Sequence, residues 1–293
     1  MQLARAHGCE VAAVEGPRDV VSVLNAAAEH GQKCVFMLAG DGTVQAAVDH
    51  LATLGAGAEI PQLLLLGGGR SNLTARDLGW NGRVLETLQA ALARSRSGEA
   101  FAVEHRQALR IEQAPAEPRH GFFMAAGLVD RVIRTCHDRR RAGGHLRSSH
   151  AGTAWTILTL AAGACIGRQH AAPADLQVEV PDREPLARPA RLLIVTTLRR
   201  LGAVDPFADR GAGTLRVTAI AERAHRLWRS LPRVLAGRFS GDMDGRRGYL
   251  SGRCQQLQLR GLERYTLDGE EFDADPTRPV LIREGMRIGF LKP

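Results

Sequence analysis

The chain has 293 residues, of which 44% are hydrophobic and 24% charged, a composition that fits one large globular domain or two medium ones. Basic residues outnumber acidic ones 39 to 31, which favours either a solvated arginine-rich surface or an anionic partner such as a nucleotide, a nucleic acid or acidic lipid headgroups. Five scattered cysteines without CxxC spacing argue against a disulfide framework or a zinc site, and no apolar stretch reaches the roughly 20 residues that a transmembrane helix needs.

The first third of the chain alternates short apolar runs with segments of helical periodicity. Continuous apolar runs are typical of parallel strands that are covered on both faces, and strands that alternate with helices predict a doubly wound parallel sheet. The expected elements are a strand at 11–14, a helix from Pro17 to Gly31, strands at 34–38 and 63–66, and a helix around 84–92.

A glycine turn lies between the apolar run at 34–38 and the next amphipathic segment, and it reads Gly40-Asp41-Gly42-Thr43. Such a turn directs backbone N–H groups and the positive end of a helix dipole at one point, which suits phosphate. Glycine permits a ligand to approach the backbone, and Thr43 is expected at the helix N-cap, where its hydroxyl serves either the helix or a ligand. Asp41 is an acid at an anion site, so we expect it to bind a ribose hydroxyl or Mg²⁺.

From residue 98 onward the periodicity changes to two. Apolar residues alternate at 103–111, 176–180 and 257–259, which predicts strands with one face in water. Two helices are expected within this β-rich part, at 128–141 and 153–166.

Three segments together resemble the diacylglycerol kinase catalytic-domain family, which includes bacterial lipid kinases and sphingosine kinases. Residues 39–43, AGDGT, are similar to its GGDGT motif, and residues 69–76, GRSNLTAR, followed by Leu78-Gly79, are similar to GTxNDxAR and LG. Residues 267–270, LDGE, are similar to the closing xDGE. The order and spacing of the segments agree over most of the chain.

The resemblance implies a fold and an activity. Residues 1–97 would form an α/β nucleotide-binding domain and residues 98–293 a β-sandwich that holds the lipid, with the active site in the cleft between them. The protein would be an ATP- and Mg²⁺-dependent lipid kinase that phosphorylates a diacylglycerol-like hydroxyl. It would be cytoplasmic and peripherally associated with the membrane, without a nucleic-acid partner, and a homodimer remains open.

The resemblance also implies roles for individual residues. Asp41 would contact Mg²⁺, Glu270 would accept the proton of the lipid hydroxyl, and Asp268 would orient the site or bind the metal. For Asp268 and Glu270 the alternative is a β-turn with solvated acids, and for Asn72 it is a loop residue bonded to its own backbone. The residues expected at the nucleotide are Ala39, Gly40, Asp41, Gly42, Thr43, Gly69, Arg70, Ser71 and Asn72.

Three departures from the family pattern keep other functions open. The sequence lacks an initial strand with an NPxSG-like loop, Arg70 and Leu73 replace Thr and Asp, and Ala212 stands where bacterial members hold a structural Mg²⁺ through Asp. A catalytically impaired relative that binds lipid or nucleotide is therefore the alternative, and a kinase of the NAD kinase type is a third. The basic segment at 134–147 is either a solvated helix end or a contact with a lipid surface.

Overall fold

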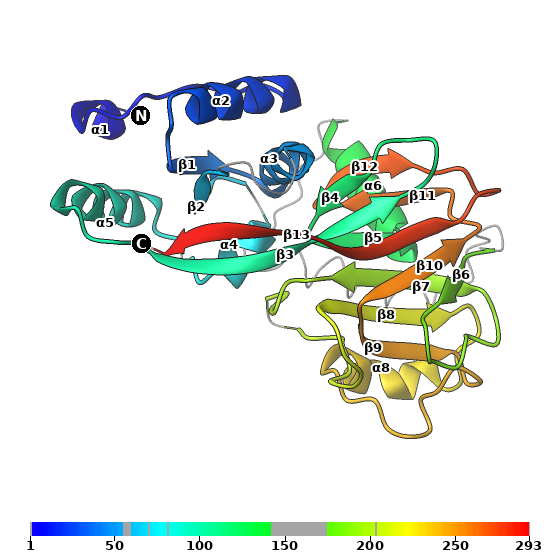
Figure 1. Ribbon diagram of the computed structural model, residues 1–293. Helices are drawn as coiled ribbons and strands as arrows, with labels where there is room; N and C mark the ends of the chain where they lie inside the picture. The colour runs from blue at the N-terminus through cyan, green and yellow to red at the C-terminus, as the bar shows by residue number, and fades with distance from the viewer. Residues whose placement is uncertain are drawn as a thin grey trace. The chain divides into compact units, whose positions relative to one another are not determined.

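The computed structural model describes residues 2–54, 60–69, 71–80, 82–141, 175–202 and 204–292, with residues 136–141 described as backbone only. It divides into two compact units, which are Met1–Arg106 with Arg287–Pro293, and Gln107–Met286 (Figure 1). The divisions fall inside strands β3 (Ala102–Glu112) and β13 (Val280–Lys292). The sequence-based division after residue 97 placed all of the last strand in the second domain, whereas its end groups with the first unit.

The first unit is an α/β structure built on parallel strands. Strand β1 pairs with β2 in parallel, from Cys34 opposite Gln62 to Ala39 opposite Gly67, and β2 pairs in parallel with β13 at Leu63 and Phe290. The carboxyl ends of β1 and β2 therefore lie at one edge of the sheet. The elements before β3 are α1 (Gln2–Ala6), α2 (Pro17–Glu29), β1 (Cys34–Ala39), α3 (Asp41–Thr53), β2 (Gln62–Gly67), α4 (Leu73–Asp77) and α5 (Val84–Ser97).

The core of this unit lies around β2. Leu64 and Leu66 pack with Ala91 of α5 and with Leu291 of β13, and the continuous apolar run is buried as expected for a covered parallel strand. The predicted helices and the strands at 34–38 and 63–66 are confirmed. The predicted strand at 11–14 is wrong: this segment has no regular structure and Val14 is exposed, because a short apolar run forms a strand only where a neighbour pairs with it.

The second unit contains two antiparallel arrangements of strands. One sheet has the order β12-β11-β5-β7-β8-β9, and in the other β10 pairs with β6 and β13 while β3 pairs with β4. Its further elements are β4 (Arg119–Gly121), β5 (Phe123–Gly127), α6 (Leu128–Arg141), β6 (Gln177–Glu179), β7 (Ala190–Thr196), β8 (Leu215–Ala221), α8 (Leu227–Leu235), β9 (Tyr249–Cys254), β10 (Gln256–Arg260), β11 (Arg264–Leu267) and β12 (Glu270–Asp273).

A single hydrophobic cluster joins the two sheets of the second unit. Leu193 and Val217 contribute from one sheet, and Leu257 and Ile282 from the other, so the unit is a β-sandwich. The period-two patterns at 176–180 and 257–259 are confirmed, since their apolar residues belong to this cluster. The helix expected at 153–166 lies outside the described residues.

Candidate functional site

The first glycine turn follows β1 directly. Gly40 adopts an extended conformation at the N-cap of α3, and its carbonyl accepts a hydrogen bond from Val44 N at 3.1 Å. The expectation that Thr43 is the N-cap is wrong, because the helix already begins at Asp41 and Thr43 lies inside its first turn. The N-cap residue has no side chain to satisfy the first N–H groups of α3, and these groups carry the positive end of the helix dipole.

The second loop follows β2 and is stabilised by Asn72. This residue is 4% exposed and left-handed, with φ 46° and ψ 44°. Its side-chain oxygen accepts a hydrogen bond from Gly69 N at 2.8 Å, and its side-chain nitrogen donates to Gly69 O at 2.8 Å. Both ends of the amide thus bind the backbone of one loop residue, Gly69, which favours the loop-stabilising role of Asn72 over direct contact with a nucleotide.

The two loops pack backbone against backbone. Gly68 N donates to the carbonyl of Ala39 at 2.9 Å, and a Cβ atom built on Gly69 would lie 2.5 Å from Gly40 Cα. A side chain at Gly69 would separate the loops, because real Cβ atoms do not approach other atoms so closely, and one at Gly40 would lie 3.2 Å from Gly69 Cα, which requires a smaller shift. These glycines therefore have a structural purpose in addition to the ligand approach that the sequence predicts.

Asp41 connects the two loops through its carboxylate. Its Oδ2 accepts hydrogen bonds from Ser71 Oγ at 2.6 Å and Leu73 N at 3.1 Å, and its Oδ1 accepts one from Thr74 N at 3.3 Å. The residue is 7% exposed, and although it is remote from α4 in sequence, its carboxylate caps the first N–H groups of that helix. Ser71 is thus placed beside Asp41, while Arg70 lies outside the described residues.

Three protein donors do not saturate a carboxylate. Each oxygen has two lone pairs, so Asp41 Oδ1 keeps one acceptor position. Mg²⁺ at phosphate sites is commonly held by one or two carboxylates together with phosphate oxygens and water, so the donor set fits such an ion only when a nucleotide is present. Within the described part of the chain no group of three or more potential ligands would hold a metal by itself.

The DGE segment forms a hairpin in the second unit. Asp268 and Gly269 join β11 to β12 as a two-residue loop with φ values of 49° and 93°, which is the geometry of a type I′ turn. Asp268 is 4% exposed, and its oxygens accept hydrogen bonds from Phe122 N and Phe123 N, each at 2.8 Å. The alternative of a hairpin turn therefore describes the backbone, but Asp268 is buried and bonded instead of solvated.

Glu270 differs from Asp268 in its surroundings. It is the first residue of β12 and is exposed, and its side chain has no hydrogen bond or ion pair with any described residue. Of the two acids in the segment, Glu270 is therefore the one whose carboxylate is available to a substrate. Its expected placement opposite Asp41 across a cleft concerns two separate units and stays a prediction.

Sequence reasoning did not find the residue that supports this hairpin. Arg134 Nε donates to both oxygens of Asp130 at 3.0 Å, and its terminal nitrogens reach Glu271 Oε2 at 3.2 Å and the carbonyl of Phe272 at 2.9 Å. Asp130 lies in the first turn of α6 and accepts a hydrogen bond from Thr266 Oγ1 at 2.6 Å. The i,i+4 spacing of Asp130 and Arg134 was a readable signal.

The basic segment at 134–147 is described only in part. Residues 142–147 lie outside the described residues, and no side chain is described from 136 to 141. Arg134 is committed to the hairpin, so it does not serve as a free lipid contact.

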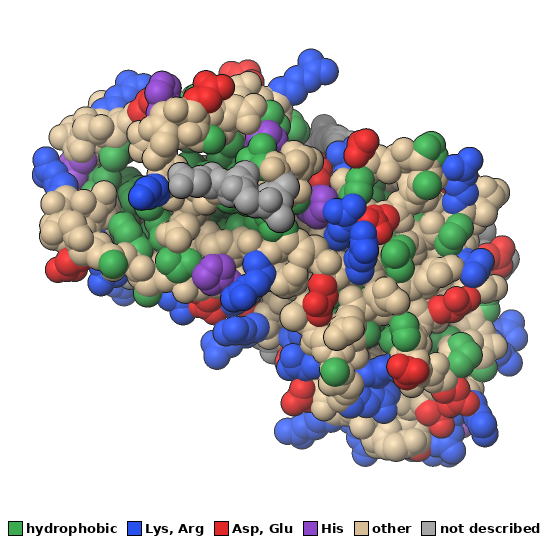
Figure 2. Space-filling model, in the orientation of Figure 1, with side chains coloured by type: hydrophobic (Ala, Val, Ile, Leu, Met, Phe, Trp, Pro, Cys, Tyr) green, Lys and Arg blue, Asp and Glu red, His purple; other side chains and the backbone are tan. Residues whose placement is uncertain are grey.

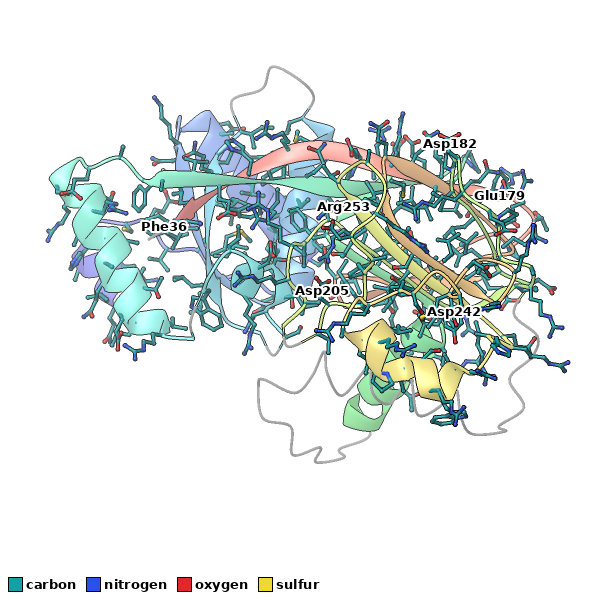
Figure 3. The ribbon with its side chains drawn as sticks, turned by 90° about the horizontal axis from the view of Figure 1, so that it is seen from below. Phe36, Glu179, Asp182, Asp205, Asp242 and Arg253 are labelled. Carbon is teal, nitrogen blue, oxygen red and sulfur yellow. The ribbon has the colours of Figure 1, made fainter. Side chains whose placement is uncertain are left out.

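A separate pocket of about 800 Å³ lies within the second unit and contains none of the predicted site residues. Arg183 forms part of its wall and donates to the carbonyls of Ser251, Arg210 and Arg253 at 2.7, 2.8 and 2.9 Å, so this guanidinium holds the wall together. Figure 3 labels Arg253 and Asp182, which also line the pocket.

The same pocket bears on the structural Mg²⁺ that bacterial members of the family hold through the Asp that Ala212 replaces. Ala212 lies in its wall, and two acids close to it in sequence, Asp205 and Asp209, are both paired with arginines: Asp205 with Arg216, and Asp209 with Arg253 at 3.1 Å. Neither acid is therefore a free metal ligand.

These features define a class of protein: an α/β unit with two interlocked glycine loops at the carboxyl ends of parallel strands, followed by a β-sandwich. Residues 2–103 match the family model of the diacylglycerol kinase catalytic domain. The predicted resemblance and the predicted fold class are thereby confirmed.

Solved structures show the same fold over most of the chain. One, described as "a putative diacylglycerol kinase from Bacillus anthracis str. Sterne", has a TM-score of 0.63 at 14% identity and covers 94% of this chain and 84% of that one. Another, described as a diacylglycerol kinase from the same organism, has a TM-score of 0.59 at 13% identity and covers 97% of this chain and 84% of its own. No curated protein matches the sequence.

Proposed function

We propose that the chain is an ATP- and Mg²⁺-dependent kinase that transfers the γ-phosphoryl group to the hydroxyl of a lipid such as diacylglycerol. The observation that carries the proposal is the pair of glycine loops at the carboxyl ends of β1 and β2, tied together by Asp41 and Ser71. Ligands of open α/β sheets bind at this edge, and the start of α3 adds backbone N–H groups that suit phosphate. The match of residues 2–103 to a kinase catalytic domain supports the same conclusion.

Each group has a distinct part in the proposed reaction. The first turn of α3 binds phosphate oxygens, and Asp41 contributes one carboxylate to the Mg²⁺ that accompanies them. That ion neutralises charge on the β- and γ-phosphates when it is bound. The lipid hydroxyl oxygen bonds to the γ-phosphorus, the bond to the bridging oxygen breaks and ADP leaves. Glu270 accepts the hydroxyl proton as the new bond forms.

The membrane assignment is part of this proposal. No helix among the described residues has the length and apolar character to cross a bilayer. We propose a cytoplasmic protein that meets its lipid at the membrane surface, in the manner of a peripheral enzyme.

The test is transfer of labelled phosphate from ATP to diacylglycerol in neutral detergent micelles with Mg²⁺. Glu270→Gln removes the proton acceptor and should lower kcat at least about 100-fold, the usual scale of a general base. Asp273→Asn is the matched control, because Asp273 is also exposed and lies on the same strand. Equal labelling by wild type and Glu270→Gln, or no labelled lipid from the wild type, contradicts the proposal.

One observation favours the alternative of a catalytically impaired relative that binds nucleotide or lipid. The side chains of Asp41, Asn72 and Asp268 all have partners within the protein. Thermal stabilisation by a non-hydrolysable ATP analogue, together with no transfer to any lipid hydroxyl, would establish this alternative. Stabilisation that accompanies transfer would exclude it.

A further inference from the structure

Helix α8 exposes a large aromatic side chain although it packs on the second unit. Trp228 is 54% exposed, whereas Val234 on the same helix is 3% exposed and forms its buried anchor. Figure 1 shows α8 beside β9, the last strand in the order of its sheet. Tryptophan buries a large apolar area in an ordinary core, so its exposure here leaves an apolar surface uncovered.

The exposed part of α8 consists of two adjacent stripes. Trp228 and Pro232 are four residues apart and share one face, and Arg229 and Arg233 form a second exposed stripe beside it. Figure 2 shows Lys and Arg side chains, with some acidic ones, on the lower part of this unit, where α8 lies. An apolar stripe bordered by arginines is the pattern of a helix that lies in a membrane interface.

The arginines near the start of α8 do not help the helix itself. Arg226 occupies the N-cap with a left-handed φ of 50°, Arg229 follows in the first turn, and no acidic residue lies there. Positive charge is unfavourable at this end of a helix dipole. Neither arginine forms an ion pair with any residue that the structure describes, so intramolecular electrostatics does not account for them.

The position of α8 within the second unit is well fixed. Tyr249 Oη donates to the carbonyl of His225 at 2.7 Å just before the helix, and Asp205 N donates to the carbonyl of Leu235 at 3.2 Å at its end. Figure 3 labels Asp205 and Asp242, which lie on the same side of this helix in that view. Asp242 is engaged by Ser240 and Arg247, and its charge also interacts with that of Arg233, although Arg233 forms no ion pair with a described residue.

We propose that α8 is a membrane-docking surface that recognises a bilayer rich in anionic lipids. Trp228 would enter the interfacial region, and Arg229 and Arg233 would contact lipid phosphates; such aromatic and basic anchors are favourable at a negatively charged surface. The partner is a lipid surface and not a second copy of the chain, because the stripes carry like charge and would repel each other in a symmetric pair. The inference extends the proposed function, since it names the surface by which a lipid kinase would reach its substrate.

The test is sedimentation of the full chain with sucrose-loaded vesicles, without ATP. Phosphatidylcholine vesicles are compared with vesicles that also contain phosphatidylglycerol. Wild type should bind the anionic vesicles, and Arg229→Glu/Arg233→Glu should weaken binding at least about tenfold, since each basic residue near the surface contributes about fivefold. Trp228→Ala, combined with the two arginine changes, should weaken binding further. Brominated lipid should quench the tryptophan fluorescence of the wild type more than that of Trp228→Phe.

The matched control is Leu85→Ala/Arg96→Glu, which removes an exposed apolar residue and an exposed arginine from α5. It should bind like the wild type, and circular dichroism should show all variants folded. Equal binding of wild type and the α8 variants, or no preference for anionic vesicles, overturns the inference. So does a dimer in sedimentation velocity that Trp228→Ala dissociates.

Kinase activity in neutral detergent micelles separates this inference from the proposed function. Lost docking with unchanged micellar activity is expected for the α8 variants. Absent micellar activity with intact, α8-dependent docking would refute the kinase proposal alone. Intact micellar activity without α8-dependent docking would refute the docking surface alone.

Discussion

Replacing Asp268 tests whether this acid is mainly a structural residue. Its carboxylate accepts hydrogen bonds from Phe122 N and Phe123 N at 2.8 Å, one buried and one part-buried. Asp268→Ala leaves both donors without an acceptor, at about 1–3 kcal/mol for each buried group. Alanine at a φ of 49° adds about 1 kcal/mol of strain. With the part-buried donor discounted for hydration, the total loss of unfolding free energy is about 3 kcal/mol.

Asp268→Asn separates the hydrogen bonds from the backbone strain. Asparagine tolerates the left-handed conformation, but its amide has one acceptor oxygen and its NH₂ group would face the other N–H. We expect a loss of about 1–2 kcal/mol. Asp182→Asn is the matched control, because Asp182 has a similar φ of 58° and is exposed. Its unfolding free energy should change by less than about 0.5 kcal/mol.

Urea unfolding followed by circular dichroism measures these losses, and amide hydrogen exchange at Phe122 and Phe123 gives a local check. Exchange at both amides should accelerate in Asp268→Ala. Glu270→Gln should lower phosphoryl transfer without changing unfolding, because Glu270 is exposed. The reasoning is refuted if Asp268→Ala unfolds at the wild-type urea concentration, or if its two amides exchange at the wild-type rate.

Three further predictions concern other residues. Gly69→Ala should weaken ATP-analogue binding and destabilise the chain by about 1–3 kcal/mol, since the new Cβ would lie 2.5 Å from Gly40 Cα. Gly16→Ala is the control, because no atom lies within 4 Å of the position of its Cβ, and calorimetry should show unchanged binding. Burial raises the pKa of Glu104, but hydrogen bonds from Lys292 and Arg106 outweigh it and lower the pKa overall, so the stabilisation from Glu104 is present above its unfolded-state pKa and is lost as the pH falls through its folded-state pKa. Glu104→Gln should therefore flatten the acid side of a plot of unfolding free energy against pH. An unchanged slope would contradict this. Burial raises the pKa of Cys254 to about 11, so at pH 8 the native protein should react with Ellman's reagent to the same extent with and without Cys254→Ser.

The sequence predicted local structure where one short pattern decides it. The apolar run before Gly40 and the helical spacing after it fixed the order strand, turn and helix, and the DG pair at 268–269 indicated a hairpin. The start of α3 was misjudged because Thr43 is a good N-cap residue, whereas the conformation of Gly40 determines where the helix begins.

Contacts between distant segments could not be predicted from spacing. Asp41 bonds Ser71 across 30 residues, and Asp268 bonds Phe122 across 146. No periodicity specifies such partners, because they depend on how the strands are ordered in the sheets. The exposure of Trp228 was likewise hidden, since an amphipathic pattern does not tell which apolar residue remains uncovered.

Strand β13 has a consequence for how the first unit is made. Its end, from residue 287, belongs to the α/β unit, where Phe290 lies opposite Leu63 of β2. During translation, a domain formed from contiguous sequence folds as soon as it leaves the ribosome. Here the α/β sheet cannot be completed until the whole sandwich has been synthesised, although β1 and β2 can pair before that. Until β13 is in place, β2 has an unpaired edge, and such edges are sites of aggregation.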